Sequence, residues 1–276
     1  MNKRFHFIFG LRPQTEPFHL VHYLCLSSCI AVNQPQEVSL HLRYEPFGPW
    51  WDRIKGRLNL RGVDDRRSSG FNEALYGRTE EGRVIAGQGI SYAHEADFIR
   101  LSLLREEGGV YADMDTLFVR PFPDFLYEQA CVLGEEDAYR GDNGVVQPSL
   151  CNAVIFSQPG SMFVSHWQEQ AMQVFDGTWS KHSCQLAARL WQRMPQHVSV
   201  APRQWFYHFG VSPAGIRALL EEKAMIPRQL LSMHLWAHLW WSERRTDFTR
   251  FHAGLLDEAY VRQGASTYAW AARQFL

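Results

Sequence analysis

Strand-like and helix-like segments alternate along the first part of the chain. Residues 5–9 form a short apolar run that predicts a buried strand, and apolar residues recur at helical spacing over residues 16–32. A second strand is expected at residues 37–42. A strand, a helix and another strand in succession predict a βαβ unit, and with it an α/β fold whose mostly parallel sheet carries helices on both faces.

The later segments continue this alternation. A charged, glycine-rich stretch at residues 135–146 is typical of a mobile loop, and residues 62–70 form a polar loop. Strands or extended segments are expected at 116–119, 130–134, 149–156 and 230–236, and helices at 52–58, 91–107, 161–175, 182–193, 213–223 and 257–274. No internal repeat or linker interrupts the chain, so residues 1–276 are predicted to form a single domain.

The most informative segment combines a charged pair with a glycine stop and two carboxylates. On a helix over residues 91–107, Asp97 and Arg100 fall on one side together with Ala93, Ala96, Leu101 and Leu104. Burying an ionised pair within an apolar stripe costs free energy unless a polar partner contacts the pair. Two glycines at 108–109 end the helix, and a short strand then leads to the sequence Asp-Met-Asp at 113–115.

The two carboxylates of this segment are suited to a metal ion. Asp113 and Asp115 alternate with Met114, so both carboxylates point the same way if they lie at the end of a strand. Two neighbouring carboxylates repel each other, and a divalent cation relieves the repulsion. Together with the charged helix, this pattern predicts an enzyme that holds a phosphorylated sugar through a metal ion.

Three linked parts of this segment resemble the signature of the sugar-transferring glycosyltransferases that contain a D-x-D motif. That group includes glycosyltransferase family thirty-two, the vertebrate α-1,4-galactosyltransferases and the glucosylating domains of the large clostridial toxins. Its pattern is Ala/Ser-Asp-x-x-Arg, Gly-Gly-Val/Ile-Tyr and Asp-x-Asp, which stands here at residues 96–100, 108–111 and 113–115. The resemblance implies a GT-A-type fold, with a nucleotide-sugar-binding half at about residues 1–120 and an acceptor half at about residues 121–276.

The resemblance also implies roles for the charged residues. Asp115 would coordinate Mn²⁺ or Mg²⁺ directly, and Asp113 would contact the ribose of the nucleotide or reach the metal through water. Asp97 and Arg100 would hold hydroxyl groups of the donor sugar as catalytic and donor-binding residues. The alternative is that these two residues form a buried ion pair that only pins the helix.

Three further residues are candidates for the donor site. Phe9 ends the first strand, where nucleotide-binding α/β folds open their crevice, and by resemblance its ring would stack on the base. Tyr111 is expected to pack near the sugar, on the same side as Asp113. Asn152 interrupts an apolar strand, and the resemblance places it close to the transferred sugar. The alternatives are core packing for Phe9 and an edge-facing polar position for Asn152.

The segment at residues 232–238 and one histidine before it hold the remaining candidates. If this segment is extended, His234, Trp236 and His238 share one face. The related families carry a His-x-Trp motif here, which implies His234 as a third metal ligand that favours Mn²⁺, with Trp236 at the donor. His238 is the second choice for the metal, and the alternative for His234 is a hydrogen-bonded core histidine. His182, at the start of a helix, is an expected acceptor contact.

These features predict a metal-dependent glycosyltransferase that moves a sugar from a nucleotide-diphosphate sugar, such as a UDP-sugar, to a hydroxyl group of a glycan or another acceptor. By resemblance the reaction retains the anomeric configuration, through a front-face mechanism in which the leaving phosphate helps to deprotonate the acceptor. Two alternatives stay open: a metal-dependent phosphoesterase that activates water with the same carboxylates, and a non-catalytic carbohydrate-binding protein.

The composition limits which classes of partner and which cellular compartment are expected. The formal net charge is -1 and no basic stripe is present, which argues against a nucleic-acid partner. No apolar stretch is long enough to span a bilayer, although peripheral association with a membrane stays compatible with the sequence. Five cysteines without a C-x-x-C pair favour a reducing compartment, and the short apolar start lacks the features of a secretory signal, so a cytoplasmic protein is expected.

Overall fold

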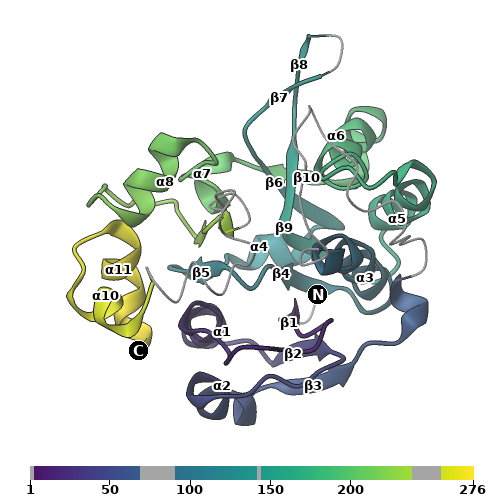
Figure 1. Cartoon of the computed structure of the whole chain (residues 1–276). Coiled ribbons are helices and arrows are strands. Elements are labelled where there is room, and N and C mark those ends of the chain that lie inside the picture. Colours follow the sequence, from purple (N-terminus) through teal and green to yellow (C-terminus); the bar gives the residue numbers. More distant parts are fainter. Residues whose placement is uncertain (1–2, 69–90, 142–143, 238–255) are drawn as a thin grey trace. The chain divides into compact units, whose positions relative to one another are not determined.

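A computed structural model describes the chain with the exception of residues 1–2, 69–90, 142–143 and 238–255 (Figure 1). The chain divides into two compact units that are interleaved along the sequence. Unit 1 comprises Met1–His6, Gly62–Ala112 and Pro123–Pro202, and unit 2 comprises Phe7–Arg61, Asp113–Phe122 and Arg203–Leu276. The single domain with two halves that meet near residue 120 stays a prediction.

Unit 1 is built on a mixed sheet with the strand order β10-β6-β9-β4, and β4 continues to the first residues of β1. Strand β9 runs antiparallel to both β6 and β4, whereas β10 is parallel to β6 and β1 is parallel to β4. All of these strands except β9 therefore share one direction, and the predicted α/β fold with a mostly parallel sheet is confirmed. The bounds are β1 Arg4–Ile8, β4 Gly109–Ala112, β6 Cys131–Glu135, β9 Leu150–Ser157 and β10 Ser199–Ala201.

The helices of unit 1 bury the charged helix α3 on nearly every side. Helix α3 packs against β4 and β9 and also against α5, which in turn contacts α6 (Figure 1). Residues 94–104 are all buried as a result, so the expectation of one buried stripe on this helix is wrong. The helices of the unit are α3 Ser91–Glu107, α4 Asp124–Glu128, α5 Met162–Val174 and α6 Cys184–Arg193, with short 3₁₀ turns η2 Asp65–Ser68 and η5 Pro195–His197.

Two glycines after α3 make the sharp turn into β4. Gly108 and Gly109 have φ angles of 66° and 100°, in the left-handed region that side chains with a Cβ rarely adopt. A Cβ at Gly109 would also stand 2.8 Å from the carbonyl oxygen of Arg4 in the neighbouring strand. The His6 ring then donates from Nε2 to the Gly108 carbonyl at 3.0 Å. The Gly-Gly pair is therefore required both by backbone conformation and by the close approach of β1.

The stretch predicted as a mobile loop contains a β-hairpin in unit 1. Strands β7 (Tyr139–Arg140) and β8 (Val146–Gln147) pair antiparallel, with Tyr139 opposite Gln147 and Arg140 opposite Val146. Arg140 also donates from Nη1 to the Gly144 carbonyl across the connection at 2.8 Å. These bonds give the stretch a regular structure, so the loop prediction is wrong for these residues.

Unit 2 contains the second part of β1, its neighbour β2 (Glu37–Leu42) and a separate two-stranded ribbon. The ribbon pairs β5 (Thr116–Phe118) with β11 (Ser232–His234) in antiparallel register, so that His234 lies opposite Thr116. The remaining elements of the unit are α1 Leu20–Asn33, α2 Pro49–Ile54, η1 Lys55–Arg57, β3 Asn59–Gly62, α7 Arg203–Phe206, α8 Pro213–Leu220, α10 Glu258–Gln263, α11 Thr267–Ala272 and η7 Arg273–Phe275.

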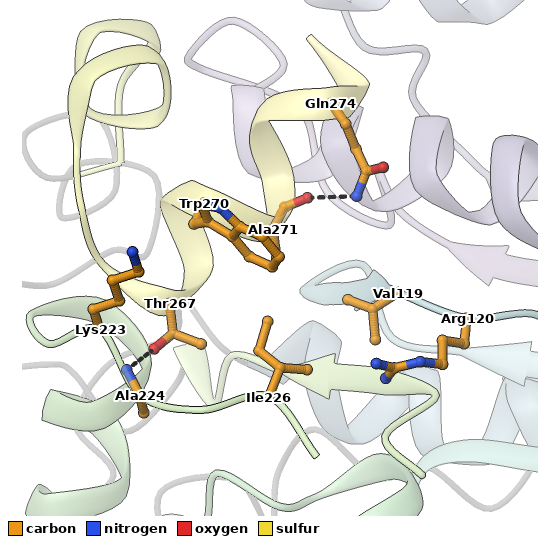
Figure 2. A pocket seen from close by; sticks show the side chains of 9 residues that line it. All are labelled: Val119, Arg120, Lys223, Ala224, Ile226, Thr267, Trp270, Ala271 and Gln274. Atoms are coloured by element: carbon orange, nitrogen blue, oxygen red, sulfur yellow. Dashed lines mark hydrogen bonds between the residues drawn. The ribbon is translucent and has the colours of Figure 1, made fainter. Parts of the chain in front are cut away.

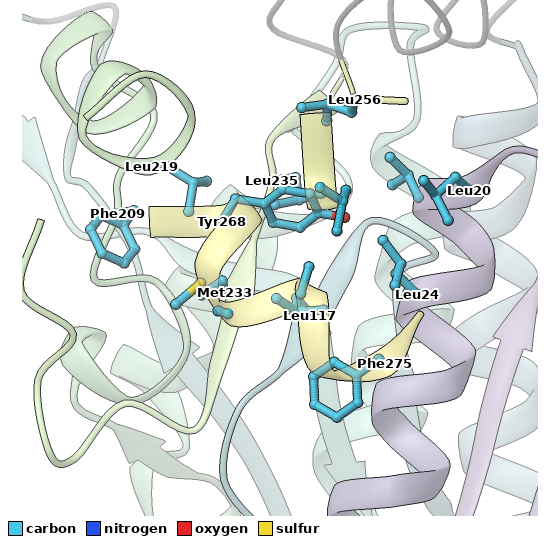
Figure 3. Close-up of a cluster of buried hydrophobic side chains, with 14 of the residues drawn as sticks. Leu20, Leu24, Leu117, Phe209, Leu219, Met233, Leu235, Leu256, Tyr268 and Phe275 are labelled. Atoms are coloured by element: carbon cyan, nitrogen blue, oxygen red, sulfur yellow. The ribbon is translucent and has the colours of Figure 1, made fainter. Parts of the chain in front are cut away.

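A hydrophobic cluster joins the ribbon of unit 2 to its first and last helices (Figure 3). Leu24 of α1, Leu117 of β5, Met233 of β11 and Tyr268 of α11 are each at most 1% exposed within it. Burial of such side chains contributes roughly 1.5–3 kcal/mol each to folding. The cluster therefore holds the ribbon, and with it the residues at the ribbon's end, in a fixed place within the unit.

Two helices of unit 2 differ from the prediction at their ends. Helix α1 begins at Leu20 rather than residue 16, because His19 caps it by accepting a hydrogen bond from the Val21 N–H. The helix expected at 257–274 is interrupted at Gly264, where a Cβ would stand 2.4 Å from the Tyr260 carbonyl oxygen. Ser266 then caps a new helix.

Candidate functional site

Asp113 and Asp115 lie in a tight turn that follows β4 directly in the sequence. The turn is closed by a hydrogen bond of 3.1 Å from the Thr116 N–H to the Asp113 carbonyl. The carboxylates are thus carried by a turn rather than by the predicted strand end. Because the turn leads into β5, its position in unit 2 is set by the pairing of β5 with β11.

His234 completes a cluster with the two carboxylates. Its Nε2 atom lies 3.0 Å from Asp115 Oδ1 and 3.8 Å from Asp113 Oδ2. The backbone after His234 also holds Asp115, since the Leu235 N–H donates to its carbonyl and the Ala237 N–H donates to its Oδ2, each at 3.0 Å. The three residues predicted as metal ligands are therefore brought together in one unit.

The geometry of this cluster fits a divalent cation. One ligand atom from each of Asp113, Asp115 and His234 can be chosen so that all three lie within 4.8 Å of one another. Two atoms that bind one ion at about 2.1 Å and at right angles are about 3 Å apart, the spacing between His234 and Asp115. Carboxylate oxygens suit Mg²⁺ and Mn²⁺ alike, and the imidazole shifts the preference towards a transition metal such as Mn²⁺.

Two residues of α1 that the sequence pattern did not indicate hydrogen-bond to the backbone of the acidic turn. The His22 ring donates from Nδ1 to the Met114 carbonyl at 3.0 Å, and Cys25 Sγ donates to the Asp113 carbonyl at 3.5 Å. Burial lowers the pKa of His22, which favours the neutral ring that this hydrogen bond uses. The sequence offered one signal for this contact, because His22 lies on the buried face of an otherwise apolar helix.

Phe9 lies beside this support. Its ring centroid is 4.8 Å from that of His22 and 5.2 Å from that of Phe18, in tilted and edge-on geometry. The side chain is partly exposed rather than fully buried. The base-stacking candidate and the acidic turn therefore belong to one unit and are connected through a single histidine, His22.

Trp236 turns away from the extended path that the sequence predicted. Strand β11 ends at His234, and Trp236 has a φ angle of 53°, so the expected single face for His234 and Trp236 on an extended segment is wrong. The indole N–H donates to the Phe209 carbonyl at 2.7 Å, and the ring packs 4.4 Å from that of His234. The side chain is 3% exposed and positions His234. His238 lies outside the described residues.

Unit 1 holds a second polar cluster, centred on Asp97 of α3. Its Oδ1 atom accepts from Asn152 Nδ2 at 2.7 Å and faces Arg100 Nη2 at 3.1 Å. Its Oδ2 atom lies 2.9 Å from His182 Nε2. Arg100 in turn donates from Nη1 to the Asn152 carbonyl at 2.8 Å. The predicted catalytic residues Asp97, Arg100 and Asn152 are therefore in mutual contact.

The charges of this second cluster balance internally. Burial alone would raise the pKa of Asp97, but the Arg100 guanidinium and the hydrogen bond from His182 outweigh it, so the pKa lies below the ordinary value. Arg100 also lies over the ring of Tyr111, 4.4 Å from its centroid. Tyr111 is 2% exposed, which makes it a support for Arg100.

His182 is buried in unit 1, although an acceptor contact was expected of it. Its ring stacks on Phe98 with an interplanar angle of 6°, and its backbone carbonyl accepts from the Trp167 indole at 3.0 Å. The side chain is 1% exposed and directs Nε2 to Asp97. The structure thus gives His182 a partner that sequence spacing did not suggest, because the two residues are 85 positions apart.

Comparison with known proteins identifies the region that contains Asp97, Arg100, Asp113 and Asp115. Residues 73–133 match the family described as "Glycosyltransferase sugar-binding region containing DXD motif". The chain is similar to Glucan organizing enzyme 1 of Cryptococcus neoformans, with 31% identity over 211 residues, which are 73% of this chain and 52% of that protein. It is also similar to Subversion of eukaryotic traffic protein A of Legionella pneumophila, with 29% identity over 85 residues, 31% of this chain and 12% of that protein.

Solved structures also match this chain, and the chain spans only part of the length of the two related proteins. Mouse xyloside xylosyltransferase 1 matches with a TM-score of 0.48 and 12% identity, covering 85% of this chain and 97% of that chain. The chain spans about half the length of the Cryptococcus protein and a smaller part of the Legionella protein. Within the described residues, no helix is long and apolar enough to cross a membrane.

Proposed function

Because the chain carries a glycosyltransferase sugar-binding region with a DXD motif, we propose that it transfers a sugar from a nucleotide-diphosphate sugar, preferably a UDP-sugar, to an acceptor hydroxyl with the help of a divalent metal ion. The observation that supports the proposal best is the convergence of Asp113, Asp115 and His234 on one point. Carboxylates and imidazole around one point form a donor set suited to a divalent ion that also binds a diphosphate.

In this proposal the residues of unit 2 bind the nucleotide end of the donor. Asp113, Asp115 and His234 would hold Mn²⁺ or Mg²⁺, and the ion would bind the diphosphate and neutralise charge that develops on the leaving group. His22 and Trp236 keep the three ligands in place through the contacts described above. The partly exposed ring of Phe9 offers a flat surface for the base.

For unit 1 we propose a positioning role for Asp97, Arg100 and Asn152. The carboxylate of Asp97 has a side-chain exposure of 11%, enough to accept a hydrogen bond from a sugar hydroxyl in addition to its protein partners. Its fixed orientation by Arg100 and His182 is the preorganisation that a transfer reaction needs. A front-face reaction with retention of configuration then requires no protein nucleophile, because the departing phosphate accepts the proton of the incoming hydroxyl.

The acceptor and the compartment also belong to the proposal. We expect a glycan or another hydroxyl-bearing acceptor, and no nucleic acid, since the net charge is close to zero. All five cysteines are free thiols and four of them are buried, which suits a reducing compartment such as the cytoplasm.

The proposal is tested by the release of nucleoside diphosphate from a panel of UDP- and GDP-sugars in the presence of Mn²⁺. We expect turnover with at least one donor, no turnover in excess EDTA, and none in Asp115→Asn. Asp52→Asn changes an exposed carboxylate of the same unit that pairs with Lys55, so it should keep the activity and serves as the matched control. Release of inorganic phosphate from simple phosphate esters at a higher rate would overturn the proposal in favour of a phosphoesterase.

A further inference from the structure

A pocket of unit 2 lies away from the acidic turn and has a composition of its own. Its volume is about 340 Å³, within the range of small-molecule sites, ~300–1,000 Å³. Figure 2 shows Lys223 and Arg120 at opposite sides, with Trp270 and Ile226 between them. Its walls are Val119, Arg120, Lys223, Ala224, Ile226, Thr267, Trp270, Ala271 and Gln274.

The β5–β11 ribbon connects this pocket to the candidate metal ligands. One end of the ribbon carries Asp115 and His234, with His234 opposite Thr116. Beyond the other end, the N–H groups of Val119 and Arg120 both donate to the Leu231 carbonyl, at 2.9 and 3.2 Å. Val119 follows Thr116 by three residue steps of extended chain, a distance of about 10 Å. The pocket and the metal ligands thus lie at opposite ends of one short ribbon.

The polar groups of the pocket favour an anionic ligand. Two of the nine wall residues are cations and none is acidic. Arg120 is held in place because Nη1 donates to the carbonyls of Pro227 and Leu230, at 2.9 and 2.7 Å. Among the described residues, the Lys223 ammonium makes no hydrogen bond or ion pair. An anion in the pocket would gain a charge-assisted hydrogen bond from the Lys223 ammonium, and the Arg120 guanidinium adds positive charge to the same pocket.

The apolar groups of the pocket favour a ligand with a flat C–H face. Trp270 is 58% exposed, although tryptophan is usually well buried. Its indole presents a negative π-face, which attracts the slightly positive C–H groups of a sugar ring. Val119 and Ile226 add apolar surface to the same pocket. A pyranose ring with an acidic substituent combines a negative charge with a flat C–H face.

We propose that this pocket binds an acidic sugar residue of the acceptor glycan, with the ring against Trp270 and the carboxylate at Lys223. The assignment of this glycan as the acceptor rests on the proposed glycosyltransferase function. The binding of an acidic sugar to the pocket does not depend on that function. A glycan held about 10 Å from the metal ligands along the ribbon would be tethered by a residue some way from its reacting end. Such a subsite raises the local concentration of the reacting hydroxyl.

The test is a calorimetric titration of the full chain with tetragalacturonate, and with maltotetraose as the neutral probe of equal length. Neither donor nor metal is present, so failure here is distinct from failure of the proposed transfer reaction. We expect tetragalacturonate to bind at least about tenfold more tightly than maltotetraose, a gap of about 1.4 kcal/mol. Higher salt should reduce the gap, because the cations are near the surface.

Variants locate the binding. Trp270→Ala should weaken tetragalacturonate binding by about tenfold or more, as loss of an anchoring aromatic does, and Trp270→Phe should restore part of it. Lys223→Gln should weaken it by about threefold and flatten the salt dependence. Met225→Ala removes a neighbouring apolar side chain that is 87% exposed and does not line the pocket, so it should change nothing. Thermal melting confirms that each variant is folded.

Three outcomes would overturn the proposal. Equal affinity for both tetrasaccharides would show that the carboxylate of the ligand does not contribute to binding. Unchanged binding in Trp270→Ala would place the oligosaccharide elsewhere. Binding to phosphatidylglycerol vesicles that Lys223→Gln abolishes, without binding of either oligosaccharide, would make the pocket part of a membrane-facing surface instead.

Discussion

The two polar clusters of this protein use similar residues but differ in their balance of charge. In unit 2, two carboxylates and one imidazole converge within 4.8 Å. In unit 1, the single carboxylate of Asp97 meets the guanidinium of Arg100, the imidazole of His182 and the amide of Asn152. With neutral imidazoles the first cluster carries two negative charges and the second carries none.

This difference indicates which cluster needs a ligand. The carboxylates of Asp113 and Asp115 repel each other unless a cation lies between them, so the charge of the first cluster suits a cation. The second cluster needs no added charge, because Arg100 neutralises Asp97, and Asn152 and His182 hold the carboxylate in place through hydrogen bonds. Metal binding should depend on the first cluster, and both folding and substrate positioning on the second.

The largest effect is expected when the balanced cluster is broken. Arg100→Met leaves Asp97 buried without its cation and should destabilise the protein by about 3–5 kcal/mol, measured by urea unfolding. The double variant Asp97→Asn, Arg100→Met removes both charges and should recover part of that loss. Turnover per folded molecule should fall by orders of magnitude if the pair positions the donor. Turnover within about threefold of the parent protein would leave the pair a purely structural role.

The second-largest effect concerns the unbalanced cluster. Asp115→Asn keeps an oxygen that can accept from the Ala237 N–H but removes one negative charge, so the fold should survive. Mn²⁺ affinity should drop by about a hundredfold, or ~2.7 kcal/mol, in a calorimetric titration. Asp52→Asn is the control that removes an exposed carboxylate of the same unit. Unchanged Mn²⁺ affinity in Asp115→Asn would place the metal elsewhere.

Local sequence patterns predicted the elements that carry both clusters. The helix over residues 91–107 and its glycine stop appear where the pattern placed them, because each depends on neighbouring residues, whereas Asp113 and Asp115 lie in a turn rather than at the predicted strand end. The pairing of His234 with this turn followed from resemblance to a family. These features are short-range or recurrent, and one sequence is sufficient to indicate them.

The same local patterns could not predict contacts between segments that are distant in the sequence. His182 meets Asp97 across 85 positions and His22 meets Met114 across 92, and neither spacing has a local signature. The burial of α3 on all sides depends on α5, which the hydrophobic period of α3 itself cannot report. Such contacts are set by strand order and helix docking rather than by local propensity.

Acid should weaken unit 1 through a histidine beside the balanced cluster. Burial lowers the pKa of His94 from 6.5 to about 4, so the unfolded chain takes up its proton before the folded protein does. The stability that depends on neutral His94 is present above pH 6.5 and is lost as the pH falls from there towards 4, by roughly 2 kcal/mol at pH 5. Urea unfolding at several pH values should show this loss. His94→Phe, which keeps the ring contacts with Phe175 and Trp179, should have a shallower pH dependence, and an equal slope would contradict this account.

The smallest of these effects should come from His234, the neutral member of the unbalanced cluster. His234→Ala removes a ligand but no negative charge, so Mn²⁺ affinity should fall by about tenfold, less than in Asp115→Asn. Mild acid should weaken binding in the parent protein more than in this variant, because a protonated imidazole has no lone pair to offer the ion. His208→Ala, a partly buried histidine of the same unit outside the cluster, is the matched control. If His234→Ala instead melts earlier while its Mn²⁺ titration is unchanged, the histidine serves the core and only the two carboxylates remain as protein ligands.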